Sequence, residues 1–164
     1  MKINLVLIRH GKAEEGNMDL KDFDRALMPK GYMQAEFVGQ ALKSKNIQPN
    51  YIICSSAKRT VETAHVISKI LDYKVSEISC LDKLYLCSHE IFDDVLAELQ
   101  ETFTGQTIIV VGHNPGISDY INIKSNSIVY HNLKTCGFAI LTIQLSDWAT
   151  IFNAKATLKY IINH

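Results

Sequence analysis

Histidine and arginine side chains recur shortly after apolar segments of this 164-residue chain. The residues concerned are Arg9, His10, Arg59 and His113. An imidazole can attack phosphorus as a nucleophile, and the planar fork of a guanidinium binds two oxygens of one phosphate. Phosphoryl transfer needs mainly such positioning and charge stabilisation. We therefore expect His10 to accept a phosphoryl group covalently, in a phosphate pocket that it shares with the other three residues.

The apolar segments that precede these residues are predicted to be buried strands. Strands are expected at residues 3–8, 51–54, 74–78, 107–111, 137–145 and 156–162. The segment at 74–78 carries the weakest pattern. The last two segments lie close enough in sequence to pair as antiparallel strands.

Helical spacing of apolar residues fills the intervals between the strands. Helices are expected from Pro29 to before Asn46, after the N-cap candidates Ser55 and Ser56, over residues 89–103, and after Asn114–Pro115. This alternation implies a three-layer α/β/α fold, with a mostly parallel central sheet and an antiparallel strand near the C-terminus. Ligands of such sheets bind beyond the carboxyl ends of the strands, which is where the four residues lie.

Other features near the four residues also favour an anion site. Two expected helices begin beside them, and a helix N-terminus offers oriented N–H donors to a phosphate. Gly11, Gly112 and Gly116 would let the backbone approach a ligand closely. Taken singly the motifs are commonplace, because an Arg-His pair often decorates a surface and a histidine before Asn-Pro-Gly often belongs to a turn. Their combination at three strand ends is what favours a site.

The composition is that of a globular protein without general affinity for polyanions or bilayers. Hydrophobic residues make up 47% and charged residues 21%, and 17 basic residues balance 17 acidic ones. We therefore expect one domain over residues 1–164 that binds neither nucleic acid nor membrane. The apolar run at residues 3–8 is too short for a signal peptide, so a cytoplasmic location is expected.

The chain is also expected to work without a metal or other cofactor. Its four cysteines, Cys54, Cys80, Cys87 and Cys136, form no CxxC pair and no metal-ligand cluster. We expect them to be reduced thiols that mostly fill the core. No group of carboxylates suited to magnesium follows the expected strands.

Three motifs together resemble the histidine phosphatase superfamily, the phosphoglycerate-mutase-like group. They are Leu7–Ala13 around His10, Ser55–Ala64 around Arg59, and Val110–Gly116 around His113. Their order and spacing match the family, and the resemblance runs from about residue 3 to residue 143. It implies that His10 is the nucleophile and that the other three residues named above form the phosphate pocket around it.

Within that superfamily the chain resembles the small SixA-type phosphohistidine phosphatases. The likeness rests on Asp24–Leu27, Gly31, Gln34–Ala35, Leu84–Tyr85 and Thr135–Gly137. Larger relatives insert a helical cap over the site, whereas residues 72–88 have room only for a weak strand and a loop. A site without a cap domain would admit a phosphorylated protein side chain, while a closed site favours small metabolites.

The chain also departs from the family pattern at one point. Mutase-like members carry a glutamate in the cap region that protonates the leaving oxygen, and no such motif is found here. Asp82, His89 and Glu90 lie in that stretch, but their spacing does not match it. The absence disfavours ester cleavage, which needs a protonated alkoxide, more than cleavage of phosphohistidine, whose imidazole leaves readily. Glu14 and Asn17 are expected to belong to a solvated loop.

Three functions are compatible with these residues. The favoured one is a metal-independent phosphatase that dephosphorylates phosphohistidine on a signalling protein through a phospho-His10 intermediate. The first alternative is a phosphomonoesterase of the same superfamily for a small phosphoester. The second is a phosphoprotein-binding module, although a binder would not need a nucleophile beside the arginines. The other histidines, His65, His89, His131 and His164, are expected to lie outside the site.

Overall fold

The computed structural model describes residues 1–99, 107–127 and 130–163. Within these residues six strands form one sheet in the order β3-β2-β4-β1-β5-β6. The strands are β1 (Lys2–Arg9), β2 (Tyr51–Ser55), β3 (Ser79–Leu81), β4 (Thr107–Gly112), β5 (Phe138–Gln144) and β6 (Ala156–Ile162). Strands β1 to β4 are mutually parallel, whereas β5 pairs antiparallel with β1 and β6 pairs antiparallel with β5. The predicted mostly parallel sheet with an antiparallel C-terminal edge is confirmed.

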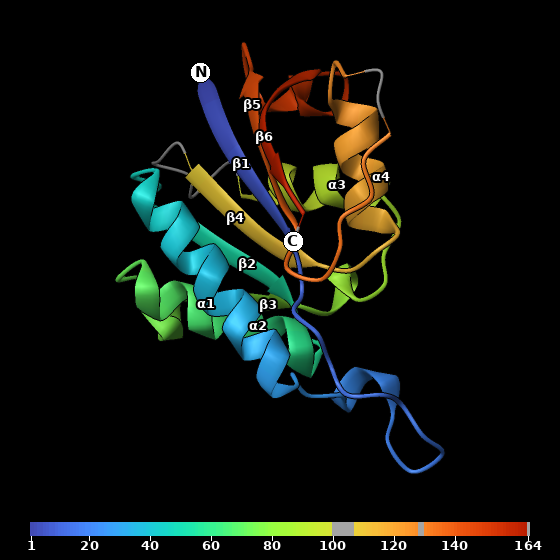
Figure 1. Ribbon diagram of the computed structural model, residues 1–164. Helices are drawn as coiled ribbons and strands as arrows, with labels where there is room; N and C mark the ends of the chain where they lie inside the picture. The colour runs from blue at the N-terminus through green and yellow to red at the C-terminus, as the bar shows by residue number, and fades with distance from the viewer. Residues whose placement is uncertain (100–106, 128–129, 164) are drawn as a thin grey trace.

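Helices cover both faces of this sheet. They are α1 (Pro29–Ser44), α2 (Lys58–Ile70), α3 (Glu90–Glu98) and α4 (Gly116–Lys124). Helices α1 and α2 share one hydrophobic core with the sheet, and α3 and α4 share the other. Figure 1 shows the two pairs on opposite sides of the strands. The three-layer α/β/α architecture is therefore as predicted.

Strand β1 explains why the first apolar run has no polar alternation. Ile3, Leu5 and Leu7 pack into the core that contains α3 and α4. Val6 and Ile8 pack into the core that contains α1 and α2. A parallel strand that is covered on both faces must be apolar at successive positions. The continuous run is thus the mark of a central strand, and it fixes where Arg9 and His10 emerge.

Two expected elements differ from the structure. The strand expected at 74–78 is wrong, because Val75–Glu77 forms a short 3-10 helix and the strand β3 follows it. Strand β3 has three residues and pairs with β2, so its hydrogen bonds to β2, and not a strand-like sequence pattern, determine where it lies. The helix expected over 89–103 is described only up to Glu98, and residues 100–103 lie outside the described residues.

Residues 71–89, between α2 and α3, carry no cap domain. They hold two short 3-10 helices and the strand β3, and no longer helix. The carboxyl ends of the strands are therefore not roofed by an inserted domain. Among the described residues, no helix combines the length and the apolar character needed to cross a bilayer.

Two glycines allow the loop after β1 to pack against the start of α1. A Cβ atom on Gly31 would lie 2.2 Å from the carbonyl oxygen of Lys12, and one on Gly11 would lie 2.7 Å from the carbonyl oxygen of Gly31. A Cβ on Gly116 would lie 2.1 Å from the carbonyl oxygen of Cys87. Gly11 and Gly116 therefore make room for other backbone.

A Gly31→Ala substitution should destabilise the protein by about 1–3 kcal/mol, because the new methyl group overpacks a backbone contact. Urea denaturation followed by circular dichroism measures the loss. Gly16→Ala is the matched control, since a Cβ there would lie 3.4 Å from the Cδ atom of Arg25, an ordinary contact. Equal midpoints for the two variants would contradict the close approach at Gly31.

Candidate active site

The carboxyl ends of β1, β4 and β2 bring the predicted residues together. Strand β4 lies between β1 and β2, and Arg9, the last residue of β1, pairs with Gly112, the last residue of β4. The following residues are His10 and His113, whose ring centroids lie 5.2 Å apart. Both imidazoles line a cavity of about 240 Å³ that also contacts Arg9 and Arg59. All four predicted residues thus meet at one edge of the sheet.

The hydrogen bonds of His10 determine which of its nitrogens carries the proton. Its Nδ1 lies 2.8 Å from the carbonyl oxygen of Gly11, which can only accept, so Nδ1 carries the proton. Its Nε2 accepts a hydrogen bond of 3.3 Å from the Nε–H group of Arg59. The lone pair of Nε2 therefore faces Arg59, and a phosphoryl group would have to replace this hydrogen bond before Nε2 could attack phosphorus.

The pKa of His10 is lowered to about 4, chiefly by burial and also by the positive charges of Arg59 and Arg9, although the hydrogen bond to Gly11 opposes the shift. His10 is only 9% exposed, so desolvation of the charged imidazolium is the leading cause. The imidazole is consequently neutral at pH 7. A neutral ring keeps its lone pair available for attack.

His113 has the complementary pattern. Its Nδ1 lies 3.3 Å from Nη2 of Arg59, which can only donate, so the proton is on Nε2. That Nε2–H group lies 2.9 Å from the hydroxyl oxygen of Ser55. Burial lowers the pKa of His113 to about 3, with further contributions from His10 and Arg59. Bound phosphate would oppose the nearby positive charges and favour the protonated ring.

Ser55 contacts a pocket imidazole rather than capping a helix. It was expected to cap α2, but the residue before that helix is Ala57, with no side-chain cap. Similarly, Asn114 does not cap α4, which begins after Pro115. The Ser55 hydroxyl contacts His113 instead, because β2 ends beside β4 and aims its last side chain at the neighbouring strand end.

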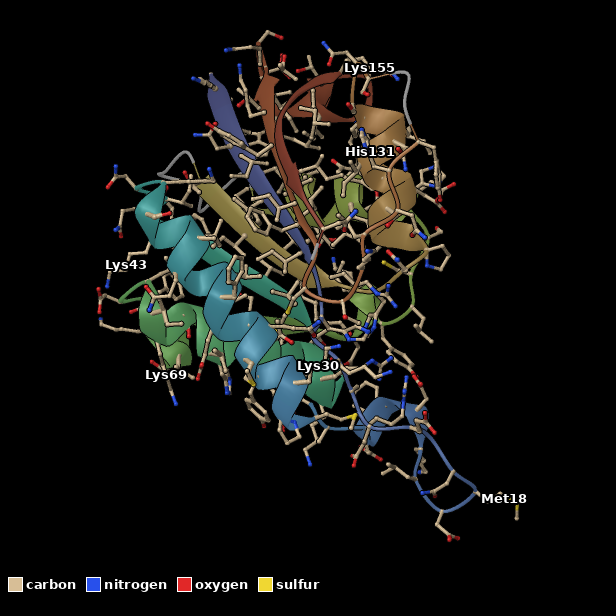
Figure 2. The ribbon with its side chains drawn as sticks, viewed as in Figure 1. Met18, Lys30, Lys43, Lys69, His131 and Lys155 are labelled. Carbon is tan, nitrogen blue, oxygen red and sulfur yellow. The ribbon has the colours of Figure 1, made fainter. Side chains whose placement is uncertain are left out.

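Arg59 is held in the pocket by Asp22. Arg59 is 1% exposed, and its Nη2 lies 3.0 Å from a carboxylate oxygen of Asp22. Its Nη1 donates to the backbone carbonyl of the same residue at 2.6 Å. Asp22 belongs to a 3-10 helix, Asp22–Asp24, within the loop that follows β1. That loop extends away from the sheet, with Met18 at its far tip (Figure 2).

Asp22 also binds two other side chains that sequence reasoning did not place in the site. Tyr85 donates its hydroxyl to Oδ2 at 2.6 Å, and Arg25 lies 2.8 Å from Oδ1. The hydrogen bond from Tyr85 lowers the pKa of Asp22 to about 2, with Arg59 contributing, so the carboxylate is ionised at neutral pH. Both Arg25 and Tyr85 lie in segments that resemble the SixA-type phosphatases, and this resemblance was the sequence feature that could have placed them in the site.

Arg9 keeps a donor unused among the described residues. Its Nη1 donates to the carbonyl of Leu133 at 2.9 Å. Its Nε is a buried side-chain nitrogen for which the described part of the chain offers no hydrogen-bond partner. A buried unpaired N–H group is costly. Arg9 also lines the pocket, where its guanidinium could bind an anion.

The charged side chains that line the pocket make it cationic. They are Arg9, Lys12, Asp22, Arg25 and Arg59. Four cations and one ionised carboxylate leave a surplus of positive charge that matches a phosphate dianion. No cluster of three metal-ligating side chains occurs within the described ranges. The arrangement offers an imidazole nucleophile, guanidinium clamps and a second imidazole for a phosphoryl oxygen.

Several candidate residues lie away from the pocket or serve its scaffold. Glu14 accepts a hydrogen bond from the backbone N–H of Ala26, and Asn17 accepts two within its own turn. The Asp82 carboxylate contacts the Ser56 hydroxyl, and His89 contacts the adjacent Glu90.

The remaining histidines do not line the pocket as far as the structure describes them. The backbone of His131 forms two hydrogen bonds with the Asn122 side chain of α4. Figure 2 shows His131 beside this helix. His65 lies on α2, and His164 lies outside the described residues. Neither His65 nor His131 lines the pocket.

Acidification from pH 7.5 to 5.0 should destabilise the protein. The unfolded chain protonates His10 near pH 6.5 and the folded protein only near 4, so stability is lost as pH falls below 6.5. The loss should be roughly 2 kcal/mol for each such histidine over that interval. Urea denaturation should show a smaller loss for His10→Asn than for wild type, and an unchanged loss for His65→Asn. Equal pH dependence of all three proteins would contradict the buried neutral imidazole.

Comparisons with solved structures find this fold in small phosphatases. A protein of Nakamurella multipartitia assigned as the phosphohistidine phosphatase SixA superimposes with a TM-score of 0.82, at 24% identity, over 99% of this chain and 96% of its own. The protein histidine phosphatase SixA in complex with tungstate superimposes with a TM-score of 0.79, at 18% identity, over 98% and 97% of the two chains. At these identities the likeness establishes the fold.

Sequence comparisons establish the family. An uncharacterised chloroplast protein of Arabidopsis thaliana is 28% identical over 90% of this chain and 70% of its own length. A mitochondrial serine/threonine-protein phosphatase of Xenopus tropicalis is 38% identical over 48% of this chain, which corresponds to only 28% of that relative. The model of the histidine phosphatase superfamily, branch 1, matches residues 5–86, half of the chain. The chain therefore belongs to the histidine phosphatase superfamily, branch 1.

Proposed function

We propose that the protein removes the phosphoryl group from phosphohistidine on a signalling protein, through a phospho-His10 intermediate. The observation that carries the proposal is the hydrogen bond from Arg59 Nε–H to His10 Nε2, because it shows an unprotonated nitrogen of a neutral imidazole inside a cationic pocket. An imidazole held in this way is a nucleophile that lies beside the pocket in which a phosphoryl group would bind.

The reaction proceeds in two transfers. Nε2 of His10 forms a bond to phosphorus while the bond from phosphorus to the substrate imidazole breaks, and that imidazole keeps the electron pair. Water then attacks the phosphorus of phospho-His10, and inorganic phosphate leaves as the P–N bond to His10 breaks. Arg9 and Arg59 bind the equatorial oxygens in both steps, and His113 holds a further oxygen.

The pocket chemistry favours a leaving group that needs no carboxylic acid. Asp22 is the carboxylate among the described residues that line the cavity, and it is ionised and already occupied by Tyr85, Arg25 and Arg59. An alkoxide leaving from a phosphoester requires a proton, whereas an imidazole whose other nitrogen is protonated leaves as a neutral ring. A phosphoramidate such as phosphohistidine therefore suits the site better than a small phosphoester.

The absence of a cap between α2 and α3 supports a protein substrate. Residues 71–89 insert no domain over the strand ends, which favours a phosphorylated side chain on a folded partner over an enclosed metabolite. The SixA structures with the same fold are named as phosphohistidine phosphatases, which agrees with this substrate class. A phosphoserine or phosphothreonine protein is the closest competitor, because a partial relative is named a serine/threonine-protein phosphatase.

Wild type and His10→Ala should be compared on a phosphohistidine-bearing carrier domain and a panel of phosphomonoesters, with a chelator present. We expect turnover of the carrier by wild type, at least a thousandfold less by His10→Ala, and wild-type rates for His65→Ala. Rapid quenching should trap an acid-labile phosphate on wild type only.

Each contrary result has a distinct meaning. Survival of turnover in His10→Ala would rule out the covalent intermediate. Preference of wild type for phosphomonoesters would overturn the substrate class while leaving the nucleophile in place. Tight binding of the phosphorylated carrier without any turnover would favour a phosphoprotein-binding module.

Ser55→Ala should lower kcat by roughly ten- to a hundredfold with little change in KM, because the buried Nε2–H group of His113 loses its acceptor and the ring its position. Ser56→Ala is the matched control, since that hydroxyl contacts Asp82 rather than a pocket imidazole. Steady-state kinetics on the carrier domain measure both. The assignment fails if both variants lose activity equally.

A further inference from the structure

Leu86 has a backbone conformation that leucine rarely adopts. Its φ angle is 47°, in the left-handed region where a branched side chain clashes with its own backbone. The other described non-glycine residues with positive φ are Asn46, Asp72 and Cys136. Asparagine and aspartate tolerate that region, and Cys136 uses it to donate its N–H to the carbonyls of Arg9 and His10. For Leu86 no comparable backbone reason is evident.

The side chain of Leu86 also gains little from the core. It is 52% exposed, although leucine is usually buried. It lines the phosphate pocket, and among the described lining residues it is the exposed apolar one, since Ala13 is 6% exposed. A phosphate group would bind the arginines and not a leucine. The part of a ligand that can contact Leu86 is therefore the group to which the phosphate is attached.

The neighbours of Leu86 hold it in this place. On one side the hydroxyl of Tyr85 is bonded to Asp22, and the Tyr85 ring lies 5.6 Å from the ring of His113. On the other side the carbonyl of Cys87 sits against Gly116, where a Cβ atom would lie 2.1 Å from that oxygen. Both flanking residues are thus anchored to elements of the pocket, and the leucine between them is presented at its mouth.

We propose that Leu86 forms a leaving-group subsite, in which its side chain packs against the flat ring that carries the phosphate. In the proposed reaction this ring is the imidazole of phosphohistidine, so its identity rests on the proposed function. Strained residues that persist at a site are commonly part of its function. The subsite requires a planar, weakly polar ring that is bonded directly to phosphorus.

Phenylphosphonate and methylphosphonate test the subsite without any turnover. Calorimetric titration of wild type should give about tenfold tighter binding of phenylphosphonate, which presents a ring to Leu86. Leu86→Asn should bind methylphosphonate within twofold of wild type and lose the preference for the phenyl compound. Met33→Asn is the control, because Met33 is 69% exposed on α1 and does not line the pocket; it should keep the preference.

Thermal melting separates a recognition role from a structural one. Leu86→Asn should melt at or above the wild-type temperature, because asparagine tolerates the left-handed region. A lower melting temperature with unchanged phenyl preference would overturn the proposal, as would a wild type without that preference. Equal weakening of both phosphonates in Leu86→Asn would also overturn it, since the effect would lie on the phosphate.

Turnover of the phosphohistidine carrier, measured in parallel, distinguishes the two proposals. A wild type that prefers phenylphosphonate but leaves the carrier phosphorylated retains the subsite and loses the proposed function. A wild type that turns over the carrier but binds the two phosphonates equally retains the function and loses the subsite.

Discussion

The guanidinium of Arg59 is a full positive charge in the interior of the protein, and its hydrogen bonds compensate its removal from water. A buried charge persists only where its donors are paired. Three of those partners, His10, His113 and Asp22, are pocket residues. The same contacts orient the two imidazoles and help to keep them neutral. The hydrogen bonds that stabilise the buried arginine are therefore the same ones that orient the nucleophile.

The pocket has a floor and a wall of different origin. The floor is made by regular elements, because the register of β1, β4 and β2 places His10 beside His113 and Ser55 beside His113. The wall is made by irregular segments, one around Asp22 and one around Tyr85, which meet through a hydrogen bond. A fixed floor with a wall from variable loops lets a common phosphate site serve different leaving groups.

This division also explains what could be predicted from the sequence. Arg9, His10 and His113 adjoin strands whose continuous apolar runs are legible, and parallel pairing then brings them to one edge. Asp22 and Leu86 lie in loops without periodicity, so their positions depend on tertiary contacts that no local pattern encodes. The strand expected at 74–78 failed for the same reason, since β3 exists only through pairing with β2. Ser55 was misassigned because a serine before a helix usually caps it.

Strand β1 comes first in the chain, yet both of its neighbours in the sheet, β4 and β5, come from the second half. The backbone N–H of Cys136, just before β5, binds the carbonyls of Arg9 and His10. During synthesis on a ribosome, a nascent chain that already contains His10 and Arg59 still has both edges of β1 open. An unpaired apolar strand is prone to associate with other strands. The backbone around His10 thus completes its hydrogen bonds only when the last third of the protein has emerged. Until then, β1 is the strand that chaperones would need to shield from association.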